Sequence, residues 1–354
     1  MRLLVTGNEG YIGTVLVPML QAAGHEVTGL DTGLFRECAL IPFTRTRTLC
    51  KDVRDVEPRD VQGFDAVIHL AGLANDPLGD LDPPLTYDIN HVATVRLAEI
   101  AKRAGVSRFL YASTCSIYGA AGDDLIDEES APNPITPYAD SKRLSEQDLL
   151  RMADGSFCPV LLRAATAYGV SPYLRFDLAL NNLVAWAYTT HLVYLKSDGM
   201  SWRPLVHIRD IAQGYLVLLE APEALVHGQA FNIGASSENY RIRQLAELVR
   251  KGVPDARLEY ADGASPDHRS YRVSCDKLPR TLPAYRPQWN AKKGIQEVYR
   301  TLKDKGLNAE AFEGPRYNRI AHVRHLLKQG RLATDLRWAE PQQAPVAPVL
   351  GAQA

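Results

Sequence analysis

The stretch TGNEGYIG, residues 6–13, decides the fold that we expect for this chain. It connects a short apolar run to a helical pattern at residues 13–24. Such a turn allows a close approach of the backbone to a pyrophosphate and tight packing of helix on strand, and its glycines are Gly7, Gly10 and Gly13. The amino end of the following helix offers unpaired N–H groups to the anion. The stretch therefore predicts a dinucleotide site, although three glycines also suit a plain strand-to-helix turn.

Short apolar segments alternate with helical segments on both sides of this turn. Strand-like runs, rich in β-branched and other apolar residues, lie at residues 2–7, 26–31, 65–72 and 107–114. Helical periodicity marks residues 13–24 and 93–105, and each of these segments ends in a glycine that suits a helix C-terminus. This alternation predicts an α/β fold with a Rossmann-like, doubly wound parallel sheet.

The second half of the chain is less regular and suggests a smaller, mixed α/β domain that binds the substrate. The expected boundaries are 1–165 for the dinucleotide-binding domain, with 205–232 returning to it; 166–204 and 233–305 for the substrate domain; 306–338 for a helical C-terminal extension; and 339–354 for a disordered, Ala/Pro-rich tail. No role is assigned to the extension.

An acidic residue, Asp31, closes the second expected strand. In a dinucleotide fold this place suits a carboxylate that accepts hydrogen bonds from the adenosine ribose. The same carboxylate repels a 2′-phosphate, so NAD is preferred to NADP, and nearby Arg36 would soften that exclusion. Asp52 is a second acid for the adenine end, with a solvated turn aspartate as the alternative interpretation.

A tyrosine and a lysine lie four residues apart in TPYADSKRLSEQ, residues 136–147. Thr136 is suited to cap a helix and Pro137 to occupy its first turn. Tyr138 and Lys142 then share one helix face, with an exposed surface pair as the alternative. A nearby ammonium favours phenolate and lowers the phenol pKa from about 10 toward neutrality. Such a tyrosine can take a proton from an alcohol as hydride leaves the carbon.

Hydroxyl groups gather upstream in YASTCSIYG, residues 111–119. Thr114 can donate to the same oxygen that Tyr138 deprotonates, and fixed donors stabilise the charge that develops there. Together with the glycine turn, these groups predict hydride-transfer chemistry on an alcohol.

Composition excludes several other classes of function. Of 354 residues, 40 are Lys or Arg and 41 are Asp or Glu. The chain therefore has no excess of positive charge that would favour binding to nucleic acid or anionic lipid. Five cysteines are scattered without metal-like spacing, and His322 and His325 lack a third ligand, so we expect no metal. No run approaches the about 20 apolar residues of a membrane span, and no signal peptide is recognised, so we expect a cytoplasmic protein.

Together these stretches resemble the extended short-chain dehydrogenase/reductases, specifically the nucleotide-sugar epimerase/dehydratase family. The resemblance spans about residues 1–306 and rests on an ordered set of motifs: TGNEGYIG, DV at 52–53, HLAG at 69–72, Asn90, STCSIYG, YADSK, NNL at 181–183 and RPLVHIRDIA from Arg203. It implies NAD as cofactor, a nucleotide-diphosphate sugar as substrate and a homodimer. It also implies that hydride leaves a sugar carbon, usually C4, to give an enzyme-bound ketosugar.

By that analogy Tyr138 is the catalytic base, Lys142 its modulator and Thr114 the hydroxyl partner. The family's cofactor-binding positions correspond here to Gly7, Asn8, Gly10, Tyr11, Ile12, Gly13, Asp31, Asp52, Val53, Leu70, Ala71, Gly72, Asn90, Ser113, Tyr138 and Lys142. Its substrate-binding positions correspond to Thr114, Cys115, Ser116, Thr166, Asn182, Arg203 and Arg269. Asn182 and Arg203 fall where the family holds the substrate diphosphate, and Arg269 is a further candidate.

The chain departs from several branches of the family at residues 114–116. The 4,6-dehydratases carry Thr-Asp-Glu there and the UDP-glucuronate decarboxylases keep the glutamate, whereas this chain has Ser116 in the third place. Enzymes that epimerise at C3 and C5 put a cysteine third, whereas Cys115 comes one step earlier. Packing along the pocket is the plainer interpretation of both residues. Thr166 stands roughly where relatives place a substrate-binding asparagine.

Epimerisation at C4 needs only the tyrosine, the lysine and the threonine, with no further acid or base at residues 115 and 116. We therefore expect an NAD-dependent nucleotide-sugar 4-epimerase. An NAD(P)H-dependent nucleotide-ketosugar reductase is the alternative, and a dehydratase or decarboxylase is disfavoured. Outside enzymes, the alternative is a dinucleotide-binding sensor that has lost catalysis. The intact set of Tyr138, Lys142 and Thr114 argues against a sensor.

Overall fold

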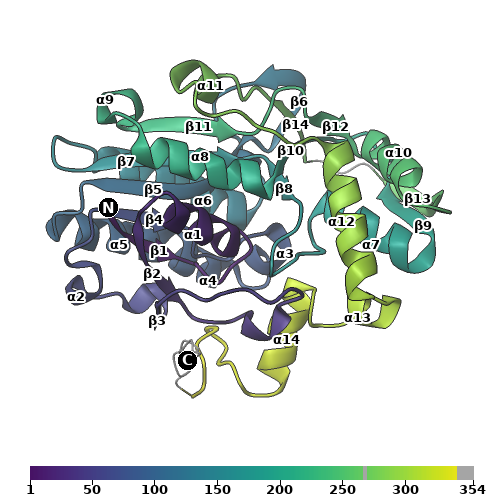
Figure 1. Cartoon of the computed structure of the whole chain (residues 1–354), viewed down its shortest axis with the longest axis horizontal. Helices are drawn as coiled ribbons and strands as arrows, with labels where there is room; N and C mark the ends of the chain where they lie inside the picture. The colour runs from purple at the N-terminus through teal and green to yellow at the C-terminus, as the bar shows by residue number, and fades with distance from the viewer. Residues whose placement is uncertain (266–268, 341–354) are drawn as a thin grey trace, which may run out of the picture.

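A seven-stranded parallel sheet forms the centre of the computed structural model, which describes residues 1–265 and 269–340 (Figure 1). The strand order is β11-β7-β5-β4-β1-β2-β3. Because β1 pairs with β2 on one side and β4 on the other, the order reverses at β1, and ligands bind at such a switch point. The strands are β1 (Arg2–Thr6), β2 (Glu26–Asp31), β3 (Thr48–Cys50), β4 (Ala66–His69), β5 (Arg108–Thr114), β7 (Cys158–Ala164) and β11 (Gln229–Ile233).

Helices cover both faces of this sheet: α1 (Gly13–Ala22) and α8 (Ile208–Glu220) on one, α5 (Ala93–Arg103) and α6 (Pro137–Arg151) on the other. Along β1, Leu3 and Val5 belong to the core on the side of α1 and α8, whereas Leu4 belongs to the core on the side of α5 and α6. A strand buried on both faces alternates its apolar side chains in this way. The predicted doubly wound α/β fold is confirmed.

Local signals in the sequence set the ends of these helices. Gly24 and Gly105 follow α1 and α5 with φ of +85° and +84°, a left-handed conformation that strains residues with side chains. At the start of α6, the Thr136 hydroxyl accepts a hydrogen bond from the Ala139 backbone N–H at 3.2 Å, and Pro137 is the first helical residue. The predicted start of this helix is confirmed.

Smaller sheets lie beside the main one, on the right in Figure 1, with the pairings β12-β10-β8, β13-β9 and β14-β6. Their bounds are β6 (Ala120–Ile126), β8 (Thr166–Tyr168), β9 (Leu192–Ser197), β10 (Trp202–His207), β12 (Asn239–Arg241), β13 (Arg257–Ser265) and β14 (Ser270–Val273). The helices α7 (Ala179–Thr190), α10 (Ile242–Gly252) and α12 (Ala291–Lys305) contact one another beside these sheets.

Short helices join these elements. They are α2 (Pro58–Val61), α3 (Asp76–Gly79), α4 (Pro83–Tyr87), α9 (Glu223–Val226) and α11 (Lys277–Thr281), with the turns η1 (Arg36–Cys38), η2 (Val53–Asp55), η3 (Asp88–Val92) and η4 (Cys115–Tyr118). Among the described residues, no helix has both the length and the apolar character needed to cross a bilayer.

The chain after residue 306 returns to the loop that follows β2. It contains α13 (Ala309–Glu313) and α14 (Arg319–Lys328), the latter drawn in yellow below the sheet in Figure 1. The His322 ring contacts the Leu34 carbonyl oxygen through Nε2 at 3.1 Å, and the Trp338 indole donates to the Thr32 carbonyl oxygen at 2.8 Å. Of the predicted tail, residues 341–354 lie outside the described residues.

A buried ion pair ties α6 to the sheet. Arg163 of β7 faces Glu146 of α6, with Nη2 2.7 Å from Oε2 and Nε 3.0 Å from Oε1. The two side chains are only 8% and 4% exposed. Ser113, near the end of β5, donates to the same carboxylate. The placement of α6 against β5 and β7 therefore depends on a charge pair shielded from water.

We expect Glu146→Ala to lower the free energy of unfolding by about 3–5 kcal/mol, because it leaves the Arg163 guanidinium buried without its partner. Urea denaturation measures the change. The matched control is Glu99→Ala on α5, whose contact with Arg103 is a half-exposed pair at 3.9 Å and should contribute less than about 0.5 kcal/mol. Similar losses in both variants would contradict the role given to the buried pair.

Candidate active site

The turn between β1 and α1 is as tight as a phosphate-binding loop requires. Gly7 has φ of +71°, and a Cβ there would lie 2.8 Å from the backbone nitrogen of Ala71. A Cβ on Gly13 would lie 2.5 Å from the Gly7 carbonyl oxygen. Within the described residues, the backbone N–H groups of Tyr11 and Ile12 have no acceptor. These two donors at the amino end of α1 suit the oxygens of a phosphate.

A cavity of about 1080 Å³, including its open mouth, extends from this turn. The residues expected around the cofactor that line it are Gly7, Gly10, Tyr11, Ile12, Gly13, Asp31, Asp52, Val53, Leu70, Ala71 and Gly72. The structure therefore brings together, in one cavity, segments from the ends of β1, β2, β3 and β4.

Asp31 is held in place by two backbone donors. Its Oδ1 accepts from Gly33 N–H at 2.8 Å and its Oδ2 from Glu9 N–H at 3.0 Å. Burial raises its pKa to about 6. Arg36, expected to soften the exclusion of a 2′-phosphate, donates instead from Nε to the buried Glu9 carboxylate at 3.0 Å. This engagement of Arg36 favours NAD over NADP at the ribose.

Some residues expected around the cofactor turn away from the cavity. Asn8 donates to the Thr48 hydroxyl at 2.9 Å, and Ser113 donates to the buried carboxylate of α6. Asn90 is fully buried and spans the Leu73 backbone, accepting from its N–H at 2.8 Å and donating to its carbonyl oxygen at 3.1 Å. Asn90 therefore positions the loop after β4.

Lys142 on α6 approaches Gly72, one of the residues that line the cavity. Its ammonium donates to the Ala112 carbonyl oxygen at 2.9 Å and lies 4.8 Å from the centre of the Tyr111 ring. The Nζ atom is 3.7 Å from where a Cβ on cavity-lining Gly72 would be. Tyr138, one helical turn earlier, is partly exposed. Both residues lie on α6, as predicted, and their role in the site remains a prediction.

The pKa of Tyr138 corrects one expectation. Burial raises it to about 12, and the groups that lower it are the Thr114 hydroxyl and the Arg175 guanidinium, while Asp76 raises it. Burial lowers the pKa of Lys142 to about 8. The expectation that Lys142 draws this phenol toward neutrality is wrong for this structure, because the ammonium is held by a backbone carbonyl and is itself costly to bury.

Hydroxyl groups form a chain next to Tyr138. Thr114 donates to the Ser116 hydroxyl at 3.1 Å, and that oxygen lies 3.4 Å from the hydroxyl of Tyr271 on β14. Cys115 points the other way: it is 1% exposed, and its thiol contacts the Arg163 carbonyl oxygen at 3.2 Å. Burial raises the pKa of this thiol well above its usual value. Cys115 therefore belongs to the core and is left out of the site that we propose.

A comparison with known families decides the class of this site. The model of the NAD dependent epimerase/dehydratase family matches residues 3–234, more than half of the chain. The chain belongs to this family. The resemblance to extended short-chain dehydrogenase/reductases that the motifs carry is confirmed.

Members of the family with related sequences act on nucleotide sugars. UDP-glucose 4-epimerase 2 of Arabidopsis thaliana is 28% identical over 333 residues, which cover 84% of this chain and 93% of the relative. UDP-glucose 4-epimerase of Corynebacterium glutamicum is 30% identical over 268 residues, 71% of this chain and 80% of the relative. UDP-glucuronic acid decarboxylase 1 of Arabidopsis thaliana is 27% identical over 89% of this chain and 72% of the relative.

Solved structures with the same fold contain NAD. The dTDP-glucose 4,6-dehydratase DesIV of Streptomyces venezuelae, with NAD bound, is 25% identical, with a TM-score of 0.75 over 88% of this chain and 100% of that one. MoeE5 in complex with UDP-glucuronic acid and NAD is 25% identical, with a TM-score of 0.73 over 86% and 99%. NAD is the cofactor of this epimerase/dehydratase-family enzyme, and the glycine turn, its free N–H groups and Asp31 fit it.

The residues expected around the substrate diphosphate converge only in part. Arg203 on β10 donates to the carbonyl oxygens of Trp202, at 2.8 Å, and of Arg269. The Arg269 guanidinium lies 2.6 Å from Asp76 Oδ2. Asn182 on α7 donates to the Phe176 carbonyl oxygen at 2.7 Å. Thr166 lies on β8, which pairs with the strand of Arg203. Arg203 and Arg269 are thus neighbours, whereas the amide of Asn182 is bonded to the backbone that precedes α7.

Among the cavity residues that escaped the sequence analysis are Arg175, Arg319 and Leu336. Arg175 lies in a loop before α7 and pairs with Asp177 at 2.7 Å. Arg319 and Leu336 come from the C-terminal extension. That region offers only helical periodicity as a signal, and periodicity does not reveal what a helix packs against.

Away from this cavity, Cys158, Glu223 and His227 hold side-chain atoms within 4.8 Å of one another. Burial raises the pKa of the Cys158 thiol, which disfavours the thiolate that a metal would need. His227 and Glu223 also form an ordinary pair one helical turn apart on α9. We assign no metal to this group.

We expect the affinity for NAD to fall about tenfold between pH 7 and pH 5, because ribose hydroxyls donate to the ionised form of Asp31 and its pKa is about 6. Protonation below that pKa removes the acceptor, so binding is strong above it and weakens as the pH falls. Calorimetric titration with NAD at several pH values measures the effect. Asp31→Asn should bind more weakly with a flat pH profile, and Asp31→Ala should relax the preference over NADP. An unaltered pH profile in Asp31→Asn would place the titrating group elsewhere.

Proposed function

We propose that this enzyme is an NAD-dependent nucleotide-sugar epimerase that inverts C4 through a ketosugar intermediate. The observation that carries the proposal is the hydroxyl chain of Thr114, Ser116 and Tyr271 beside Tyr138. Where dehydratases and decarboxylases of the family carry an acid, this chain places the Ser116 hydroxyl. A hydroxyl can hold a sugar in position, but it does not move protons at neighbouring carbons without help.

The chain's own groups have defined tasks in this proposal. Bound NAD would supply the hydride acceptor and donor that this reaction needs at the sugar carbon. The Tyr138 phenolate takes the proton of the carbinol and later gives it back, while Thr114 donates a hydrogen bond to the same oxygen. The positive charge of oxidised nicotinamide would add to that of Arg175 in lowering the pKa of the phenol. Lys142, close to Gly72, is placed to hold the nicotinamide ribose.

The substrate's diphosphate is assigned to Arg203 and Arg269. An arginine presents a planar fork of donors that matches phosphate oxygens. Arg269 faces Asp76, whose other oxygen accepts from the Thr136 hydroxyl at 2.8 Å at the start of α6. A diphosphate arriving here would compete with Asp76 for Arg269. Substrate binding is thereby coupled to the helix that carries Tyr138.

The relatives support the epimerase more than the alternatives. UDP-glucose 4-epimerases of a plant and a bacterium match most of the chain, although a decarboxylase does so as well. A nucleotide-ketosugar reductase would use the same tyrosine and lysine, and differs in consuming one reduced cofactor per turnover. A sensor would need neither residue.

We expect Tyr138→Phe to lower turnover by about 10²–10⁴-fold, the usual contribution of a positioned acid–base group, while bound NAD stays unchanged. Turnover by NMR and the NAD content of the purified protein are the two measurements. Tyr87→Phe is the matched control, since its hydroxyl contacts Asp140 on the same helix, at 3.0 Å, away from the hydroxyl chain. Loss of NAD from Tyr138→Phe would show that the residue has a different role.

The reaction itself is tested by screening UDP-, GDP-, CDP- and dTDP-sugars by NMR, with and without added NAD. A 4-epimerase should convert at least one of them to its C4 epimer for many turnovers without added cofactor, since hydride removed from the sugar is returned to it. Turnover that stops without NAD(P)H would favour the reductase. Loss of the C6 hydroxyl or of carbon dioxide would sink the proposal in favour of a dehydratase or decarboxylase.

A further inference from the structure

The C-terminal segment, residues 319–338, forms part of the cavity wall. Leu336 and Arg319 line the cavity directly. Leu336 has φ of +61°, which is uncommon for a branched side chain and is held here by burial in an apolar cluster. That cluster joins the segment to other walls of the cavity and contains Leu73, Leu78, Ile89, Val323, Leu326, Leu332 and Leu336.

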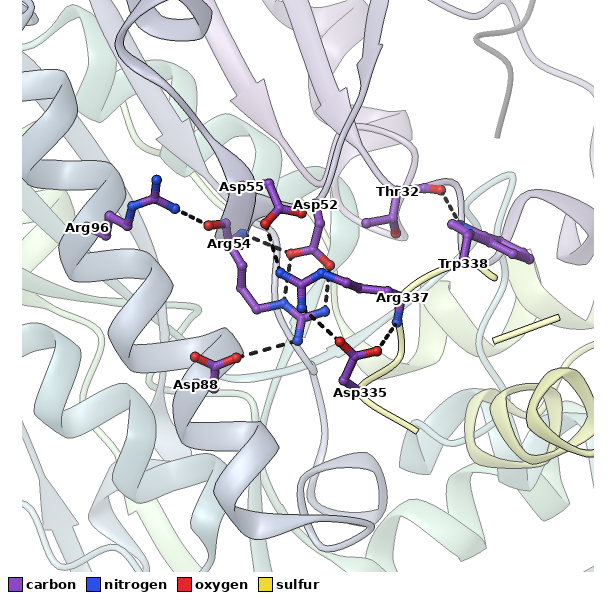
Figure 2. A network of polar contacts seen from close by, with 9 residues as sticks. All are labelled: Thr32, Asp52, Arg54, Asp55, Asp88, Arg96, Asp335, Arg337 and Trp338. Atoms are coloured by element: carbon purple, nitrogen blue, oxygen red, sulfur yellow. Dashed lines mark hydrogen bonds and ion pairs between the residues drawn. The ribbon is translucent and has the colours of Figure 1, made fainter. Parts of the chain in front are cut away.

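Polar contacts fix the end of the segment beside Asp31 and Asp52. Figure 2 shows Arg337 between Asp55, at 2.8 Å, and Asp335, at 3.0 Å. It also shows the Trp338 indole donating to the carbonyl oxygen of Thr32, a residue that lines the cavity. Both contacts join the segment to the loops that follow β2 and β3. The segment is therefore tied across the end of the cavity where Asp31 would hold the ribose.

Arg319 differs from the other cations that line the cavity, because no carboxylate forms an ion pair with it in the described part of the chain. The other cations of the cavity have carboxylate partners: Lys51 with Asp60, Arg54 with Asp52, and Arg175 with Asp177. Arg319 is 6% exposed, and its Nη1 atom is buried without a hydrogen-bond partner in the part of the chain that the structure describes. A buried cation without a partner is strongly destabilising.

Its surroundings make this charge still less favourable. Arg319 is the first residue of α14, at the positive end of the helix dipole, where a cation is disfavoured. Burial, the largest effect, lowers its pKa to about 10, and repulsion by Arg175 lowers it further, while attraction by Asp177, which already pairs with Arg175, opposes this; the guanidinium is still protonated at neutral pH. The Cζ atom of Arg319 lies 3.8 Å from the centre of the Phe35 ring. This contact orients the guanidinium but does not neutralise its charge.

An anion in the cavity would supply the missing partner, and the bound cofactor has one. We propose that the Arg319 guanidinium binds the diphosphate of NAD, and that the C-terminal segment thereby closes over the cofactor and retains it. Tyr11 and Ile12, whose backbone N–H groups are free, line the same cavity. These N–H groups of the glycine turn would be the second set of donors to the diphosphate. This inference rests on NAD as the cofactor and is independent of the proposed reaction at C4.

The test uses full-length protein freed of cofactor and three probes: NAD, ADP-ribose and adenosine, the last of which lacks the diphosphate. Arg319→Met should weaken NAD and ADP-ribose about 10–100-fold, the effect of losing a charge-assisted hydrogen bond, and should leave adenosine within about twofold. Arg319→Lys keeps the positive charge but lacks the planar pair of guanidinium donors. Its affinity for NAD and ADP-ribose should therefore fall about 3–10-fold. Arg324→Met, an exposed arginine on the same helix, is the matched control and should bind like the parent.

Two outcomes would overturn the diphosphate contact. Unchanged binding of ADP-ribose to Arg319→Met would show that the charge does not reach the cofactor. An equal loss for adenosine would show a structural effect. Thermal denaturation gives an independent test. Without NAD, Arg319→Met should have a Tm no lower than that of the parent, because an unpaired buried charge has been removed. Added NAD should raise the Tm of the variant less than it raises that of the parent. If Arg319→Met does not fold, Arg319→Lys decides, since parent-like binding of ADP-ribose would refute the contact.

Retention is tested separately by the rate at which NAD leaves. The double variant Arg337→Gln with Trp338→Ala removes the two polar contacts at the end of the segment. It should speed NAD dissociation about fivefold to tenfold, in line with one surface ion pair and one hydrogen bond. Lys328→Gln, an exposed change at the end of α14, is the control. An unchanged dissociation rate in the double variant would refute closure by the segment.

Discussion

The buried pair of Arg163 and Glu146 holds together the parts of this enzyme that have to meet. It joins α6 to the sheet, and the Ser113 hydroxyl near the end of β5 donates to the same carboxylate. The same guanidinium donates to the Tyr118 hydroxyl at 3.0 Å, so the turn that carries Ser116 is attached as well. Glu146 also raises the pKa of Lys142 against the effect of burial. One charge pair thereby positions α6 and the turn after β5, and it partly offsets the effect of burial on Lys142.

The cavity combines two kinds of recognition that meet at the loop after β4. At the ribose end, carboxylates are fixed by backbone N–H groups and neighbouring arginines, as Asp31 and Glu9 show. At the chemical end, neutral hydroxyls surround Tyr138, and the charges there are already paired, as Asp76 is with Arg269. Asn90 holds the loop between the two ends by its backbone.

Much of this arrangement was predictable from the sequence, because it depends on local signals. The strands, α1, α5 and α6 follow from periodicity, glycines and the Thr136 cap, and the cavity-lining glycines and Asp31 follow from the spacing of one motif. The predictions that the structure corrected concern features that depend on contacts between residues distant in sequence. Side-chain direction turned Asn8, Ser113 and Cys115 away from the site, and burial reversed the shift expected for the Tyr138 pKa. Arg319 and Leu336 reach the cavity only through tertiary packing, on which no motif reports.

The tie between Trp338 and Thr32 spans 306 residues of sequence. Because synthesis proceeds from the amino end and domains fold as they emerge, the glycine turn and Asp31 are in place long before the residues that close the cavity. On the ribosome the nascent enzyme therefore presents an open, one-sided groove. That groove acquires its second wall only after the residues up to Trp338 have been synthesised.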